Sequence, residues 1–196
     1  MDTPLHSLKG LLPRLARMVG KTPAALYERQ RVLMEAGLLQ AVAGRGPGSG
    51  VRATPQSMAA LLIALLATET VAETGERTAA VMKLKSASDT KRCPITGKKT
   101  FAEALTAILA SEELARQIEF FEVGRSGEKA GACILRKGAS YGVDGTSFWT
   151  KHNADDLSQF GSGLLASAGE GLGIQARLRL PFDKIAHSLT KPENEK

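Results

Sequence analysis

Residues 11–55 read LLPRLARMVGKTPAALYERQRVLMEAGLLQAVAGRGPGSGVRATP, and this stretch decides the fold. It predicts two helices around a tight turn, followed by two short strands around a glycine-rich loop. Gly20 can end the first helix, because glycine tolerates the left-handed conformation there. Thr22 can cap the second helix, and Pro23 fits its first turn, where no N–H is needed. We expect that second helix to end just before Gly37.

The second helix has an inner and an outer side when successive residues are placed about 100° apart. Leu26 and Leu33 fall on the inner side. The outer side carries small, aromatic and charged side chains and no aliphatic one. Such a face suits the floor of a DNA major groove, where a helix with a small N-terminal end can approach base edges. Its members are Ala24, Tyr27, Glu28, Arg31 and Glu35.

The segment after this helix predicts a β-hairpin. Leu38–Ala43 and Val51–Pro55 can pair as its two strands. The tip between them, Gly44–Gly50, contains four glycines, one proline and one arginine. No hydrophobic core needs such a tip. A wing that lays Arg45 along a phosphate backbone or into a minor groove would use it.

This order of elements resembles the winged helix-turn-helix of bacterial transcriptional regulators of the MarR and GntR kind. The resemblance rests on LMEAGLL at residues 33–39, GRG at 44–46 and VRATP at 51–55, and it covers about the first 70 residues. It implies binding to double-stranded DNA. The alternatives are an ordinary helical turn followed by a hairpin, and a winged helix used only for protein contacts.

The expected DNA contacts fall into three groups. Two alanines permit close approach, and the aromatic and charged side chains beside them face base edges. Basic residues of the turn and the wing contact phosphates or the minor groove. Hydroxyl side chains serve as neutral phosphate partners. The ten residues are Lys21, Thr22, Ala24, Ala25, Tyr27, Glu28, Arg31, Arg45, Ser49 and Arg52.

The positive charge is concentrated in the same part of the chain. The whole sequence of 196 residues carries a net charge of +6. Residues 1–56 hold eight Lys and Arg against three Asp and Glu, which is +5, and the remaining 140 residues contribute only +1. A local positive field is what a polyanionic partner requires.

Residues 58–67 are apolar on every side of a predicted helix that begins at Thr54 and Pro55. The run is too short to cross a bilayer, which takes about 20 residues. A helix of this kind has to be buried all round. It packs either under a second domain or against its twin in a dimer. We expect a homodimer formed at least in part through this helix, because paired DNA half-sites need a two-fold protein.

The expected fold class is α+β, with a winged helix-turn-helix followed by a small domain that contains an antiparallel sheet. Residues 1–75 form the DNA-binding unit with the apolar helix, and 76–99 a basic linker or surface loop. Residues 100–190 form the second domain, which serves self-association, a protein partner or a small ligand, and 191–196 a polar tail. Predicted helices are 5–12, 14–19, 55–73, 76–84, 101–117 and 182–189, and predicted strands are 118–123, 132–136, 147–150 and 174–180.

The sequence lacks the common catalytic signatures. It contains no Walker lysine loop, no H-E-x-x-H, no C-x-x-C and no G-x-S-x-G. Cys93 and Cys133 are far apart and the three histidines are scattered, so we expect no metal site. We therefore predict a protein that is not an enzyme, with no catalytic residues and no cofactor. Because no apolar run follows a charged leader, we expect a cytoplasmic protein without a membrane partner.

These observations predict a sequence-specific DNA-binding transcriptional regulator, activator or repressor, that reads a palindromic site as a dimer. Two rival functions use the same unit. One is a replication or partition protein of a mobile element, and the other is a protein-binding adaptor.

Overall fold

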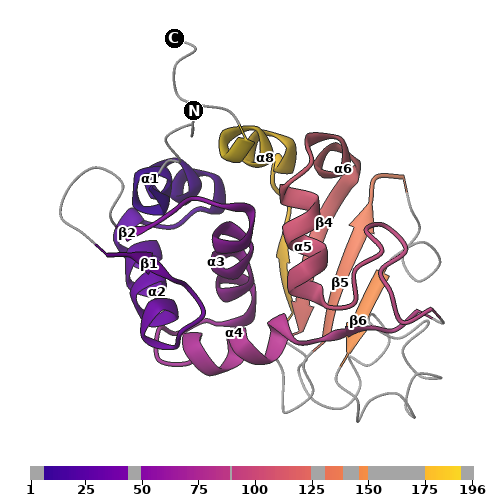
Figure 1. Ribbon diagram of the computed structural model, residues 1–196, viewed down its shortest axis with the longest axis horizontal. Coiled ribbons are helices and arrows are strands. Elements are labelled where there is room, and N and C mark those ends of the chain that lie inside the picture. Colours follow the sequence, from indigo (N-terminus) through magenta and orange to yellow (C-terminus); the bar gives the residue numbers. More distant parts are fainter. Residues whose placement is uncertain are drawn as a thin grey trace.

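The computed structural model describes residues 7–43, 50–88, 90–124, 131–138, 146–149 and 175–190. Within these ranges, helices pack on one another and on a five-stranded antiparallel sheet, which confirms the α+β class. Figure 1 shows α3 between the first two helices and α5, with the sheet beyond α5. The elements are α1 (Leu8–Val19), α2 (Pro23–Glu35), β1 (Ala41–Val42), β2 (Gly50–Val51), α3 (Pro55–Ala67), α4 (Thr74–Met82), β3 (Lys85–Ser86), α5 (Phe101–Leu109), α6 (Glu112–Gln117), β4 (Ile118–Gly124), β5 (Gly131–Arg136), β6 (Thr146–Trp149), β7 (Gln175–Leu178) and α8 (Phe182–Thr190).

The sheet has the strand order β3-β6-β5-β4-β7, so β4 lies between β5 and β7. Phe121 on β4 is paired with Ile134 on one side and Leu178 on the other. Its ring meets that of Phe182 on α8 edge to face, with centroids 4.4 Å apart. The helices therefore cover the face of the sheet to which Phe121 points. The strands predicted at 118–123 and 132–136 are confirmed, and so is the part of 147–150 that the structure describes, up to Trp149. The strand predicted at 174–180 ends earlier, at Leu178, and residue 174 lies outside the described residues.

The first helix runs unbroken from Leu8 to Val19 with Pro13 inside it, so the prediction of two helices separated at this proline was wrong. An internal proline forfeits one backbone hydrogen bond and costs about 3 kcal/mol. The apolar spacing continues across it, however, because Leu8, Leu12 and Leu15 are all buried. Packing of this continuous stripe outweighs the local cost.

The apolar helix α3 lies at the centre of the molecule. It contacts α2, α4 and α5 as well as β4 and β7. Every residue from Met58 to Ala67 is buried except Leu65, which is partly exposed. The chain itself thus covers this helix, which is the first of the two predicted alternatives. The expectation that a second copy covers it is corrected, because α3 has almost no surface left for one.

The helix predicted at 55–73 is shorter than expected, because α3 ends at Ala67, just before the polar Thr68. The helix predicted at 76–84 is α4, which begins at Thr74 and ends at Met82. The helix predicted from 101 to 117 is two helices, because the Ser111 side chain accepts a hydrogen bond from the N–H of Leu114 at 3.3 Å and caps α6. One buried cluster nevertheless runs from Leu8 to Leu189. The division of the chain into domains remains a prediction.

Both cysteines are buried and free. Burial, and next the charge of Glu122, raise the pKa of Cys133 to about 12. This thiol therefore stays protonated at neutral pH and is a poor nucleophile.

The start of α5 carries the predicted capping box, and it makes stability depend on pH. The Glu103 carboxylate accepts hydrogen bonds from the backbone N–H groups of Lys99 and Thr100 at 3.1 and 3.2 Å. The bond from Thr100 is the largest cause of a lowered pKa at Glu103. A carboxyl group whose pKa is lower in the folded chain stabilises it above the unfolded value, and this contribution is lost as the pH falls through the folded value.

Replacing Glu103 by alanine should therefore lower the free energy of unfolding at pH 7 by about 0.3–1.5 kcal/mol, the usual range for one helix-capping feature. The difference from the wild type should shrink below the unfolded pKa of 4.5 and vanish in stronger acid. Urea denaturation at pH 7 and pH 3 measures both values. Glu113→Ala, at an exposed acid of α6, is the control. A difference of the same size at both pH values would contradict a charged capping role.

Candidate nucleic-acid interface

The turn between α1 and α2 has the predicted chemistry. Gly20 adopts the left-handed conformation with φ 64°, and its N–H donates to the carbonyl of Ala16. The Thr22 hydroxyl accepts from the N–H of Ala25 at 3.2 Å, and Pro23 stands in the first turn of α2. These three features fix a short, tight connection between two packed helices.

The inner side of α2 contains an arginine that the sequence did not single out. Leu26, Arg29, Gln30 and Leu33 are its buried residues. The Arg29 guanidinium donates to the carbonyl of Glu69 at 2.9 Å and so ties α2 to the segment after α3. Arg29 lies three residues after Leu26 and four before Leu33, so helical spacing places it on the same side of α2. Arg29 therefore adds nothing to the positive charge on the outer surface.

The outer side of α2 carries an ion-pair network. The Arg31 guanidinium lies 3.0 Å from the Glu28 carboxylate and 3.2 Å from that of Glu35. The hydrogen bond to Glu28, and next its charge, raise the pKa of Arg31. The trio has a net charge of −1. Arg31 has to exchange partners before it can contact a base, and the outer side of α2 does not by itself attract phosphates.

The positive surface lies instead on α1. Lys9, Arg14 and Arg17 on α1 and Lys21 just beyond it are all exposed. At 100° per residue, Lys9, Arg14 and Arg17 fall within an arc of about 140°. No Asp or Glu occurs between Thr3 and Tyr27. Three cations thus share one side of α1, and together with Lys21, which follows the helix end, we call them the α1 cationic face.

The sequence prediction left Arg14 and Arg17 as solvated or phosphate-facing residues and did not group them with Lys9, because it divided the helix at Pro13. Only a continuous helix places the residues before and after the proline on one face. This face is joined to α2 by a cation–π contact, in which the Lys9 ammonium lies 5.2 Å from the centre of the Tyr27 ring. Tyr27 is 41% exposed.

The hairpin is confirmed as a two-stranded antiparallel pair, β1 with β2. Beyond it, Arg52 is exposed and forms a bridge with Ser7, which ties the hairpin exit to the start of α1. The predicted contacts Arg45 and Ser49 lie outside the described residues. Of the other predicted contacts, Lys21, Thr22, Ala24, Tyr27, Arg31 and Arg52 are exposed, and Ala25 and Glu28 are half-buried.

Among the residues described, no helix has the length and apolar character needed to span a membrane. The same residues bring together no group of three or more His, Cys, Asp or Glu side chains that could hold a metal ion. No family model, no curated protein and no solved structure matches this chain.

Proposed function

We propose that this protein is a sequence-specific DNA-binding regulator that uses α1 and α2 as a helix-turn-helix within a winged unit. The observation that carries the proposal is the α1 cationic face, which continues through Lys21 into the exposed N-terminal end of α2. Four cations without a neighbouring acid in the sequence supply the electrostatic attraction.

The two helices would divide the work as in other helix-turn-helix proteins. The first helix of such a motif crosses the phosphate backbone, and the N-terminal residues of the second contact base edges. Here α1 offers the cations, whereas α2 offers Ala24, Tyr27 and the Arg31 network. Phosphate contacts position a protein, and base contacts specify the sequence. We therefore assign affinity to α1 and specificity to α2.

The double variant Arg14→Ala/Arg17→Ala should weaken binding to every duplex and leave the ranking of sequences unchanged. Loss of two phosphate contacts should lower the slope of log K against log salt by about 1.8, since each contact to duplex DNA contributes about 0.9. Fluorescence anisotropy with a labelled duplex at four salt concentrations measures affinity and slope.

Two further variants make this test specific. Lys83→Ala/Lys184→Ala removes the same charge from exposed positions outside α1 and α2 and should keep the wild-type slope. Arg31→Ala should keep it as well, because Glu28 and Glu35 already balance that charge, but it should relax the sequence preference. An unchanged slope in Arg14→Ala/Arg17→Ala would refute the assignment of phosphate contacts to α1.

Selection from a randomised duplex pool at two salt concentrations tests sequence reading directly. Enrichment of a palindromic site would support two copies acting together and give the half-site spacing. Salt-sensitive binding without an enriched motif would favour the replication or partition alternative. Absence of binding at low salt would overturn the proposal and favour the protein-binding adaptor.

A further inference from the structure

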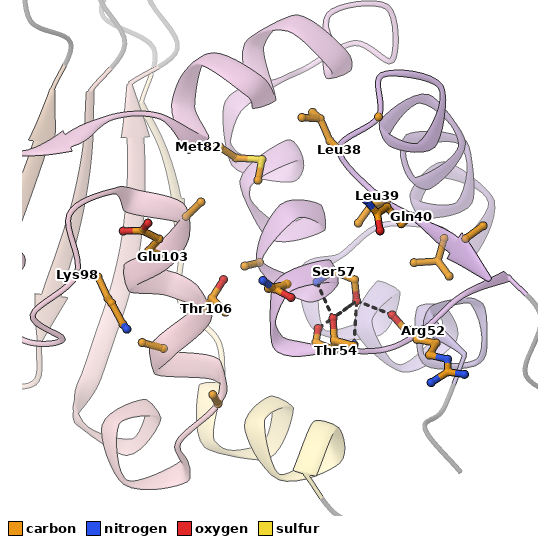
Figure 2. A pocket seen from close by; sticks show the side chains of 18 of the residues that line it. Leu38, Leu39, Gln40, Arg52, Thr54, Ser57, Met82, Lys98, Glu103 and Thr106 are labelled. Carbon is orange, nitrogen blue, oxygen red and sulfur yellow. Dashed lines mark hydrogen bonds between the residues drawn. The ribbon is translucent and has the colours of Figure 1, made fainter. Parts of the chain in front are cut away.

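A long groove separates the hairpin from α5 (Figure 2). Its volume is about 1280 Å³, which exceeds the usual range for small-ligand pockets of about 300–1,000 Å³. Residues 37–42 line one wall and α5 lines the other, while the first turns of α3 contribute to the lining between them. In Figure 2, Thr106 points from α5 toward the open space.

The charge around this groove is strongly biased. Four cations line it, Arg52 from the hairpin exit and Arg92, Lys98 and Lys99 from the turn before α5. Glu103 is the one acid among its lining residues. That carboxylate already accepts two backbone hydrogen bonds in the capping box. Because the Arg52 side chain extends away from the open space in Figure 2, the excess of positive charge comes mainly from the turn before α5.

The turn that carries three of these cations is held in one shape. Its backbone is tied by a hydrogen bond from the Cys93 N–H to the Lys98 carbonyl at 2.7 Å, and Cys93 itself is buried. The Arg92 guanidinium donates to the Gly97 carbonyl at 3.1 Å. Lys91 adopts a left-handed conformation with φ 54°. A fixed turn lets a ligand bind with a smaller loss of side-chain and loop entropy.

The rest of the lining indicates which part of a ligand is recognised. No aromatic residue is among those that line the groove. Nucleic-acid bases are usually held by stacking on aromatic rings, so base recognition is not provided for here. Apart from Glu103, the α5 wall consists of small side chains, Ala102, Thr106 and Ala107, followed by Ala110 at the helix end. Lysine and arginine side chains are good partners for phosphate oxygens.

We propose that this groove binds phosphate esters through the cations of the turn before α5, with little preference for the attached base. The ligand is either a strand of nucleic acid or a free phosphate compound, which share this chemistry. The inference does not depend on the α1 cationic face, because none of the four residues of that face lines the groove.

Two probes separate the two sources. Binding of fluorescein-labelled dT12 is followed by anisotropy, and binding of ATP by calorimetry. Lys98→Ala/Lys99→Ala should lower the affinity for the probe at least fivefold. For the strand, loss of two contacts should also lower the salt slope by about 1.4, since each contact to a single strand contributes about 0.7.

A neutral variant and two charge controls locate the site. Ala107→Phe fills the groove without changing charge and should weaken binding by a similar factor. Two double variants remove equal charge from other parts of the surface and should leave the affinity for the probe unchanged. They are Lys83→Ala/Lys184→Ala and Arg14→Ala/Arg17→Ala. Because the last pair tests the α1 face, failure of that proposal and of this one are distinguishable.

A loss of affinity confined to the two groove variants supports the proposal. The probe that binds then shows whether the ligand is a strand of nucleic acid or a free phosphate compound. Equal loss in a control pair, or none in Ala107→Phe, would overturn it in favour of general surface charge. Equal binding of a labelled twelve-residue polyglutamate would overturn the phosphate assignment in favour of an acidic peptide. Absence of binding by both probes at low salt would also overturn it.

Discussion

Replacing Leu62 by alanine is expected to lower the free energy of unfolding by about 2–5 kcal/mol, the range measured for large-to-small substitutions in protein cores. Leu62 has no exposed surface, and α3 touches helices and strands from both halves of the chain. The cavity left behind can collapse little, because its neighbours belong to several different elements. Urea denaturation followed by far-UV circular dichroism measures the loss.

Leu65→Ala provides the control for this variant, because Leu65 lies on the same helix and is partly exposed. The loss in free energy of unfolding should be clearly smaller for this variant than for Leu62→Ala. Hydrogen exchange shows whether α3 supports the whole molecule. In Leu62→Ala, amides of α1 and of β4 should lose protection together. Loss restricted to α1 and α2 would mean that α3 stabilises only the N-terminal part.

Arg177→Ala should have the second large effect, because it leaves a buried carboxylate without its ion-pair partner. Glu122 is 1% exposed, and its carboxylate lies 2.7 Å from the Arg177 guanidinium. Breaking a buried pair by removing one partner costs about 3–5 kcal/mol. The Arg177 side chain is 38% exposed, so we expect the lower end of that range. The same guanidinium lies 4.3 Å from the centre of the Phe120 ring, and this contact is lost as well.

Two variants separate the charge effect from general damage to β7. Glu122→Leu/Arg177→Met replaces both charges by apolar groups and should recover most of the stability, as apolar substitutes for buried ion pairs often do. Arg179→Ala removes an exposed partner of Glu119 at 3.7 Å and should cost less than about 1 kcal/mol. If Arg177→Ala and Arg179→Ala destabilise equally, the buried carboxylate does not decide the effect. Thermal and urea denaturation measure all four chains.

Local chemistry was predictable from the sequence. Gly20, Thr22 and Pro23 determine a helix end and a helix start through backbone conformation and one hydrogen bond, and all three act as predicted. The capping box of Thr100 and Glu103 is a feature of the same kind. Such features depend on residues within a few positions of one another, which is why a single sequence contains them.

The remaining features depend on partners far apart in the chain. Pro13 predicts a break by local rules, and only the packing of Leu8, Leu12 and Leu15 against the core keeps α1 continuous. The pairing of Glu122 with Arg177 spans 55 positions. The groove needs the hairpin and α5 side by side, which neither segment specifies alone. Arg29 shows the intermediate case, since its helical spacing was visible but its bond to the Glu69 carbonyl was not.

The central place of α3 bears on how the protein is made. During synthesis this apolar helix leaves the ribosome before α5, β4 and β7, the elements that later cover it. The nascent chain therefore carries a run of exposed leucine and alanine side chains until these later elements have been made. Such transiently exposed surface favours aggregation and engages chaperones. Slow translation between α3 and β7 should lengthen this vulnerable interval and lower the yield of native protein.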